Sequence, residues 1–229
     1  MKWTTRFLCI ITALSLFLIL LISSMDYAIY YRPDFYEETF DKYNVCSYAK
    51  MEMKEVLKVS DYLIDYLKDE EESLEHFQAI VDGQNRTFYS QREILHMEDV
   101  KELFMGGILI RRICILLVIL LPIVMHTQKI NFVRKLLRCI IGTFLSILEL
   151  LGILVLLISS NFNRAFTIFH KIFFNNDLWI LDPEKDWVIR LLPEGFFLDM
   201  SIVIGTKFAI LLFSTLGICI GLLKWKKIK

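Results

Sequence analysis

The sequence predicts a mainly α-helical membrane protein, in which a four transmembrane helix bundle carries an extracellular cap of helices and a small hairpin. Three observations predict this fold class. The 229 residues are 55% hydrophobic, with a mean hydropathy of +0.50, which is too apolar for an ordinary soluble domain. The chain contains four apolar runs of membrane-spanning length. Its charges sum to zero, but they are distributed unequally between the segments that separate these runs.

The apolar runs set the order of the elements along the chain. We expect a first transmembrane helix within residues 1–25, a cap at 26–105, a second transmembrane helix at 106–125, a loop at 126–135, a third transmembrane helix at 136–159, an outer interfacial segment at 160–200, a fourth transmembrane helix at 201–223 and a tail at 224–229. Because each crossing takes about 20 residues, the remaining length excludes a separate large soluble domain.

The first apolar run, residues 7–24, follows Lys2 and Arg6 in the manner of a signal peptide. It is longer than the usual apolar core of a signal peptide, about 7 to 15 residues, and we find no convincing small-residue cleavage site after it. We therefore expect a retained transmembrane helix.

Orientation follows from the charges beside the spans, because basic residues concentrate on the cytoplasmic side. Segment 26–105 has 19 acidic and 9 basic residues, and segment 161–200 has 6 acidic and 4 basic residues. Both segments are therefore predicted to be extracellular, with both termini in the cytoplasm. This asymmetry accounts for the charge pattern without a nucleic-acid partner. The other flanks contain ten basic and no acidic residues: Lys2, Arg6, Lys129, Arg134, Lys135, Arg138, Lys224, Lys226, Lys227 and Lys229.

The cysteines argue against an outer domain held together by disulfides. Of the five cysteines, only Cys46 falls in a predicted outer segment, and one thiol cannot form an internal bridge. The pattern disfavours four-span junction and tetraspanin-like proteins, and the role of Cys46 stays open.

The cap is expected to be folded. Asp82-Gly83, between two short β-prone stretches at 78–81 and 87–89, predicts a hairpin. The spacing of Ser90 and Glu93 is that of a capping box, so a helix should begin there and run towards the second span. This helix carries His96, with Asp99 on the same face, an arrangement that can orient an imidazole and raise its basicity. The alternative interpretation is a surface histidine beside an acid.

The outer segment at 160–200 surrounds His170 with aromatic residues at helical spacing. One interpretation is an interfacial anchor with His170 on its polar edge, because aromatic side chains favour the headgroup level of a bilayer. The other is an aromatic substrate pocket around His170. A second, short helix is predicted to start at Asp182-Pro183. The pocket residues would be Phe166, Phe169, Phe173, Phe174 and Trp179.

Four ionisable residues fall within the predicted spans: Arg111, Arg112, Lys207 and Glu149. Charges inside a membrane are costly, so such groups usually pair or face a polar cavity. We expect either an ion-pair cluster that fixes helix packing or a polar floor under an outer-leaflet substrate site.

Residues 92–100 (REILHMEDV) and 169–183 (FHKIFFNNDLWILDP), followed by Leu192-Pro193-Glu194 and Phe196-Phe197, resemble the bacterial lipoprotein intramolecular transacylase family. In topology the resemblance covers essentially the whole chain, and in motif it is confined to these two outer segments. It implies an acyltransferase of the bacterial cell membrane. This enzyme moves the sn-2 acyl chain of a diacylglyceryl group, on the N-terminal cysteine of a lipoprotein, to the α-amine of that cysteine. The resemblance further implies that His96 and His170 are catalytic.

The residue types are consistent with this reaction. The substrate supplies its own amine nucleophile, so no covalent acyl-enzyme is required. One histidine would take the amine proton while the other stabilises the oxyanion and assists the leaving glyceryl oxygen. We assign the base to His170 and the donor and proton shuttle to His96, oriented by Asp99, with Asp177 as a further supporting residue. The two side chains should then lie within about 10 Å of each other.

Two alternatives stay open. The histidines could begin a metal site completed by Asp99 or Asp177, although no HExxH-type spacing is present and no further ligand can be nominated; we expect neither a metal nor another cofactor. The chain could instead be a non-enzymatic transporter or receptor subunit, with the charged residues in its spans lining a path. The expected partners are diacylglyceryl-modified lipoproteins and membrane lipid.

Overall fold

The computed structural model describes residues 2–128 and 132–228. Lys129 and Lys229, two of the basic residues used to predict orientation, lie outside the described residues. The chain divides into two compact units. The first, here called the span unit, comprises Met1–Met25, Gly107–Ser160 and Ile204–Lys229; the second, called the cap unit, comprises Asp26–Gly106 and Asn161–Val203.

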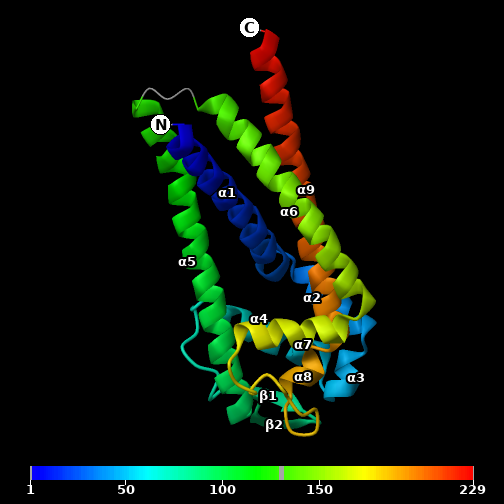
Figure 1. The fold of residues 1–229 in the computed structure, drawn as a ribbon. Coiled ribbons are helices and arrows are strands. Elements are labelled where there is room, and N and C mark those ends of the chain that lie inside the picture. Colours follow the sequence, from blue (N-terminus) through cyan, green and yellow to red (C-terminus); the bar gives the residue numbers. More distant parts are fainter. Residues whose placement is uncertain (1, 129–131, 229) are drawn as a thin grey trace. The chain divides into compact units, whose positions relative to one another are not determined.

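Four helices are long and apolar enough to cross a membrane (Figure 1). They are α1 (Lys2–Tyr30), α5 (Gln91–Thr127), α6 (Val133–Ser160) and α9 (Glu194–Ile228). The prediction of a mainly helical protein with four spans is therefore confirmed. At about 1.5 Å per residue, the 37 residues of α5 extend over about 55 Å, well beyond a hydrocarbon core of about 30 Å. The same helix thus contains the predicted second span and the predicted cap helix, and it continues through Gly106 and Gly107 without a break.

Phe17 of α1 lies at the centre of the span unit. Its ring makes edge-on contacts with Phe144 of α6, at a centroid distance of 6.0 Å, and with Phe208 of α9, at 5.3 Å. Edge-to-face pairs of this kind add to the packing energy of buried aromatic rings. The sulfur atoms of Cys9 and Met125 approach to 3.9 Å and join α1 to α5. The other buried residues of this cluster are Ala13, Leu137, Ile140, Leu212, Leu216 and Cys219.

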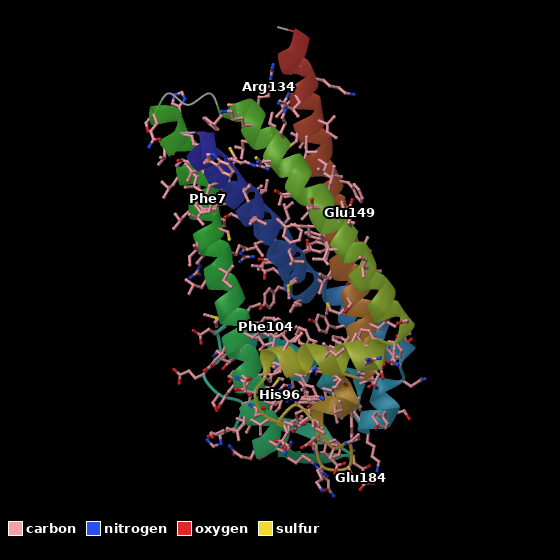
Figure 2. All side chains as sticks on the ribbon, viewed as in Figure 1. Phe7, His96, Phe104, Arg134, Glu149 and Glu184 are labelled. Atoms are coloured by element: carbon pink, nitrogen blue, oxygen red, sulfur yellow. The ribbon has the colours of Figure 1, made fainter. Side chains whose placement is uncertain are left out.

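Arg112 and Glu149 do not take part in the predicted cluster of four ionisable groups. Both side chains are exposed, and neither makes an ion pair with another described residue. Glu149, marked in Figure 2, is displaced by about 100° around α6 from Leu148, which packs against the buried cluster. The phase of the helix therefore turns its carboxylate away from the core. Arg111 and Lys207 are half-buried within the span unit.

The cap unit contains the remaining elements: α2 (Pro33–Lys42), α3 (Val45–Ala49), α4 (Met53–Leu67), β1 (Gln78–Val81), β2 (Gln84–Thr87), α7 (Phe162–Phe173) and α8 (Val188–Leu191). Aromatic side chains from α2 and the start of α9 form part of its core. Phe40 stacks on Phe196 with ring centroids 5.8 Å apart, and Phe35 and Tyr36 contact the same ring. The first turn of α9 is thereby anchored against α2.

The predicted hairpin is present. β1 and β2 pair antiparallel, with Val81 opposite Gln84, and Asp82 and Gly83 form the two-residue turn. Both turn residues have positive φ, 54° and 72°, as the tight turns that match strand twist require. The second strand begins earlier than predicted because a two-residue turn lets pairing resume at once at Gln84.

Candidate active site

His96 lies on the second turn of α5, whose start is fixed by the predicted capping box. The Ser90 amide donates to Glu93 Oε2 at 2.7 Å, and the Glu93 amide donates to Ser90 Oγ at 3.2 Å. The box satisfies two backbone donors that would otherwise lack partners and sets the phase of the helix. His96 therefore faces into the cap unit, where it is only 6% exposed.

His170 lies near the end of α7, which begins immediately after Asn161. The Asn161 side chain caps the helix by accepting from the Arg164 amide at 2.9 Å. His170 is 7% exposed, but other positions around the same helix carry exposed apolar residues. Such an amphipathic pattern is typical of a helix at a membrane surface, and the interfacial location of this segment stays a prediction. The exposed apolar residues are Ile168, Phe169, Ile172 and Phe173.

The two histidines meet in the cap unit. Their ring centroids are 6.0 Å apart, which lies within the 10 Å expected for shared chemistry. Phe174 contacts both rings, with centroids 5.3 Å from His96 and 5.6 Å from His170. Trp179 packs against His170 at 4.9 Å, and Phe166 does so at 4.2 Å. Two imidazoles from distant parts of the chain thus share an aromatic environment.

Phe169 and Phe173 form the outer part of this aromatic group. Phe169 contacts the His170 ring edge-on at a centroid distance of 5.4 Å, and Phe173 packs on Phe169 at 4.8 Å. All five predicted pocket residues therefore lie on the His170 side of the site, and only Phe174 contacts both histidines.

The hydrogen bonding of His170 defines its tautomer. Its Nδ1 lies 2.8 Å from the carbonyl oxygen of Phe166, one helical turn earlier. A carbonyl oxygen can only accept, so Nδ1 carries the proton and the neutral ring presents a lone pair at Nε2. Burial lowers the pKa of His170, against the opposing effect of this hydrogen bond, and favours the neutral ring. His170 is therefore set up to accept a proton at Nε2.

His96 has a different environment. Its Nδ1 is buried and has no hydrogen-bond partner among the described residues. It belongs to the part of α5 that precedes the apolar run from Gly106, and this part contains many charged residues. Burial, followed by the nearby His170, lowers the pKa of His96 to about 4; Asp99 opposes this shift, and Arg92 adds to it. His96 is therefore neutral at neutral pH.

The predicted hydrogen bond between Asp99 and His96 is absent. Asp99 Oδ2 instead accepts from Asn176 Nδ2 at 2.8 Å. Asn176 also accepts, through its backbone carbonyl, from the indole of Trp179 at 3.0 Å, and its Oδ1 accepts from the Leu178 amide at 3.1 Å. The Asp99 carboxylate therefore bonds to the segment that follows α7 and not to His96. Asp99 contributes to the site by joining α5 to this segment.

Asp177 also binds away from the histidines. Its carboxylate forms an exposed ion pair with Arg92 at 3.5 Å, and its backbone carbonyl accepts from the same guanidinium. Arg92 Nε donates to the Ile180 carbonyl at 3.2 Å. Arg92, on the first turn of α5, therefore holds the chain both before and after Trp179.

Glu93 has a second role that the capping-box pattern alone does not reveal. Its fully buried carboxylate also accepts from the Val188 amide at 2.5 Å, at the start of α8. Burial raises the pKa of Glu93, while its hydrogen bonds oppose the shift. Ser90 Oγ donates to Asp186 Oδ1 at 2.7 Å and makes a second connection. The residues that begin α5 therefore hold the chain in place at the start of α8.

The short helix predicted at Asp182-Pro183 begins later, at Val188. Asp182 caps a turn instead, since its Oδ1 accepts from the Glu184 amide at 3.0 Å and its carbonyl accepts from the Lys185 and Asp186 amides. Asp186 Oδ2 in turn accepts from the Asp182 amide at 2.8 Å, which closes the turn before a helix can propagate.

The residues proposed for a metal site are engaged elsewhere, Asp99 with Asn176 and Asp177 with Arg92. Within residues 2–128 and 132–228, no group of three or more histidine, cysteine or acidic side chains is arranged to hold a metal ion.

Comparisons with known proteins identify the family. The solved structure of the membrane integral lipoprotein intramolecular transacylase Lit from Bacillus cereus matches with a TM-score of 0.80 and 24% identity, over 100% of both chains. A variant of that protein with one histidine replaced by alanine matches with a TM-score of 0.75 and 22% identity, over 100% of this chain and 97% of that one. At these identities the likeness establishes the fold.

No curated protein sequence matches the chain. The family model for lipoprotein intramolecular transacylase Lit matches residues 10–197, which include both histidines and most of the two units. The chain therefore belongs to the lipoprotein intramolecular transacylase family.

Proposed function

We propose that this protein transfers the sn-2 acyl chain of a diacylglyceryl-modified lipoprotein to the α-amino group of the same cysteine, with His170 as the base and His96 as the oxyanion donor. The proposal is supported mainly by the two buried imidazoles, whose ring centroids are 6.0 Å apart. Nδ1 of His170 is hydrogen-bonded, whereas Nδ1 of His96 has no partner among the described residues. The substrate provides both nucleophile and acyl donor, so the protein has to supply positioning, a proton acceptor and charge stabilisation.

The tautomers of the two rings support this division of roles. The Phe166 carbonyl leaves His170 with a lone pair at Nε2. For His96, the buried and unbonded atom is Nδ1. A buried acceptor without a partner is tolerated better than a buried N–H without one, which favours the tautomer with the proton on Nε2. One ring then presents an acceptor and the other a donor, as an acyl transfer requires.

The reaction proceeds through a tetrahedral intermediate. The α-amine attacks the ester carbonyl carbon, and the new C–N bond forms as His170 Nε2 takes the amine proton. The carbonyl oxygen becomes an oxyanion, to which the His96 N–H donates a hydrogen bond. The bond from carbon to the glyceryl oxygen then breaks, and the proton on His170 passes to that oxygen. An ester becomes an amide, and no proton is gained or lost overall.

This scheme revises the role of His96. With a pKa of about 4, His96 is a neutral imidazole at neutral pH and a poor proton acceptor, so its remaining N–H acts as a hydrogen-bond donor and the ring is not a shuttle. His170 both takes the proton and returns it. The shared contact with Phe174 keeps the two rings together while excluding water, which strengthens the hydrogen bond to the oxyanion.

Purified protein in lipid bilayers with a synthetic diacylglyceryl lipopeptide tests the proposal. Because substrate and product have the same mass, tandem mass spectrometry must locate the acyl chain on the amine. We expect His170→Ala to lower the rate by about 10²–10⁴-fold and His96→Ala by about 10²–10³-fold. Undiminished transfer by either folded variant would overturn its assigned role, and loss of activity with EDTA would favour the metal alternative.

A crossover experiment tests the intramolecular step. A lipopeptide with a deuterated sn-2 chain is mixed with one whose peptide carries a heavy isotope. Transfer within one molecule yields two products that each keep their own label. Products in which the labels are exchanged would show transfer between lipopeptides and contradict this part of the proposal.

A further inference from the structure

The cap unit contains an open cavity of about 490 Å³ that neither histidine lines. Its walls are formed by the first residues of α5 and by the turn that precedes α8: Ser90, Arg92, Ile180, Asp182, Lys185 and Asp186. The volume lies within the range of small-molecule binding sites, about 300–1,000 Å³. The catalytic scheme assigns it no function.

The position of this cavity along α5 can be compared with that of His96. From the apolar run that begins at Gly106, the helix passes Phe104, then His96 and finally Arg92; Figure 2 marks Phe104 and His96. Arg92 lies one turn before His96, about 6 Å further along the axis and on the same helix face. Along α5, His96 therefore falls between the apolar run and the first residues of the helix, which line the cavity.

We propose that this cavity binds the polypeptide segment that follows the modified cysteine of the substrate. The inference rests on the proposed function. A diacylglyceryl cysteine has three ends: acyl chains that belong in the membrane, an amine and ester that react, and a carbonyl from which the polypeptide continues. With the reacting groups at His96 and His170 and the acyl chains towards the apolar run, the polypeptide leaves in the direction of Arg92. An extended chain covers this distance in about two residues, at about 3.3 Å each.

The chemistry of the walls indicates the kind of peptide that fits. Arg92 and Lys185 supply two positive charges, and each pairs with a carboxylate, Arg92 with Asp177 and Lys185 with Asp182. Ser90 is bonded to Asp186. The formal charges of the lining residues cancel, with Arg92 and Lys185 against Asp182 and Asp186, so the cavity offers no net attraction to a charged peptide. It is suited to an uncharged polar segment that makes backbone and apolar contacts, the latter with the exposed Ile180 side chain.

The test compares two substrates that share one diacylglyceryl cysteine. The first ends as the cysteine amide, and the second continues for four uncharged polar residues. We expect the longer substrate to have a KM about tenfold lower, equivalent to about 1.4 kcal/mol, with a similar kcat. Raising the salt concentration should leave this ratio unchanged. Equal KM values would overturn the inference while leaving the proposed function intact, whereas absence of transfer with both substrates would overturn the proposed function itself.

A matched pair of variants locates the effect. Ile180→Arg fills the cavity with a long side chain, and Ile80→Arg makes the same change at a similarly exposed isoleucine on β1, outside the cavity. We expect Ile180→Arg to reduce the advantage of the longer substrate to about twofold or less, and Ile80→Arg to retain it. An equal loss in both variants, or no loss in Ile180→Arg, would show that the peptide binds elsewhere.

Discussion

Asn176 donates a hydrogen bond from its side-chain amide to the carboxylate of Asp99 at 2.8 Å, and so ties the segment after α7 to the helix that carries His96. Through its backbone carbonyl the same residue holds the indole of Trp179, which packs on His170. Asn176 therefore contacts the immediate neighbours of both histidines and acts as a positioning residue.

We predict that Asn176→Ala lowers kcat by about 10- to 100-fold with little change in KM, because a small misplacement of reacting groups is costly. Asn176→Asp should be at least as severe, since it places a second carboxylate against Asp99. The measurement is steady-state transfer on the lipopeptide.

Asn175→Ala is the matched control, because Asn175 is exposed and makes no hydrogen bond with a described residue. It should stay within about twofold of the parent, as exposed substitutions away from special features usually do. Similar losses in the Asn175 and Asn176 alanine variants would contradict a specific role for Asn176.

The two histidines should be neutral at pH 7 and in opposite tautomers. Because burial lowers both pKa values, each ring takes a second proton only below its ordinary value of about 6.5, and His96 only near pH 4. Nitrogen-15 NMR of histidine-labelled protein distinguishes the tautomers, with assignments from His96→Ala and His170→Ala. A protonated His96 at pH 7 would contradict the proposed donor role.

The same pKa shifts have a consequence for stability. Unfolded histidines bind protons below pH 6.5 or so, whereas the folded rings resist protonation until lower pH. The contribution of His96 is therefore fully present above its unfolded pKa and declines as pH falls from about 6.5 towards about 4. Thermal unfolding of the parent and of His96→Asn over this range should show a smaller decline in the variant.

Removal of the buried Glu93 carboxylate should destabilise the cap unit. In Glu93→Ala the Val188 and Ser90 amides lose their acceptors, and each buried donor left unpaired costs about 1–3 kcal/mol. Hydrogen exchange at Val188 should accelerate, and the unfolding temperature should fall. Glu98→Ala, at an exposed position on the same helix, is the control and should change neither. Unchanged exchange in Glu93→Ala would contradict the proposed connection between α5 and α8.

Gly195 should not tolerate a side chain. A Cβ atom at this position would lie 2.3 Å from the ring of Tyr43, which packs directly on the first turn of α9. We expect Gly195→Ala to destabilise the protein by about 1–3 kcal/mol, as overpacking does. Gly205→Ala, where nothing lies within 4 Å of the added atom, should be close to neutral. Equal unfolding temperatures for the two variants would contradict this contact.

Local signals in the sequence determined most of the secondary structure. Apolar runs indicate the four spans, because a bilayer requires long uncharged helices, and Asp82-Gly83 and Ser90-Glu93 determine a turn and a helix start through contacts within a few residues. The family motifs also contain His96 and His170. These features depend on residues close together in the chain.

Only the tertiary structure decided the partners of the polar side chains. Sequence spacing paired Asp99 with His96, but Asn176, which lies 77 residues away in the chain, takes its carboxylate. Likewise, the phase of α6 turns Glu149 outward, and Glu93 reaches Val188 across a separation of 95 residues. A polar group bonds to whichever partner the fold brings within about 3 Å, and that choice depends on the packing of distant segments.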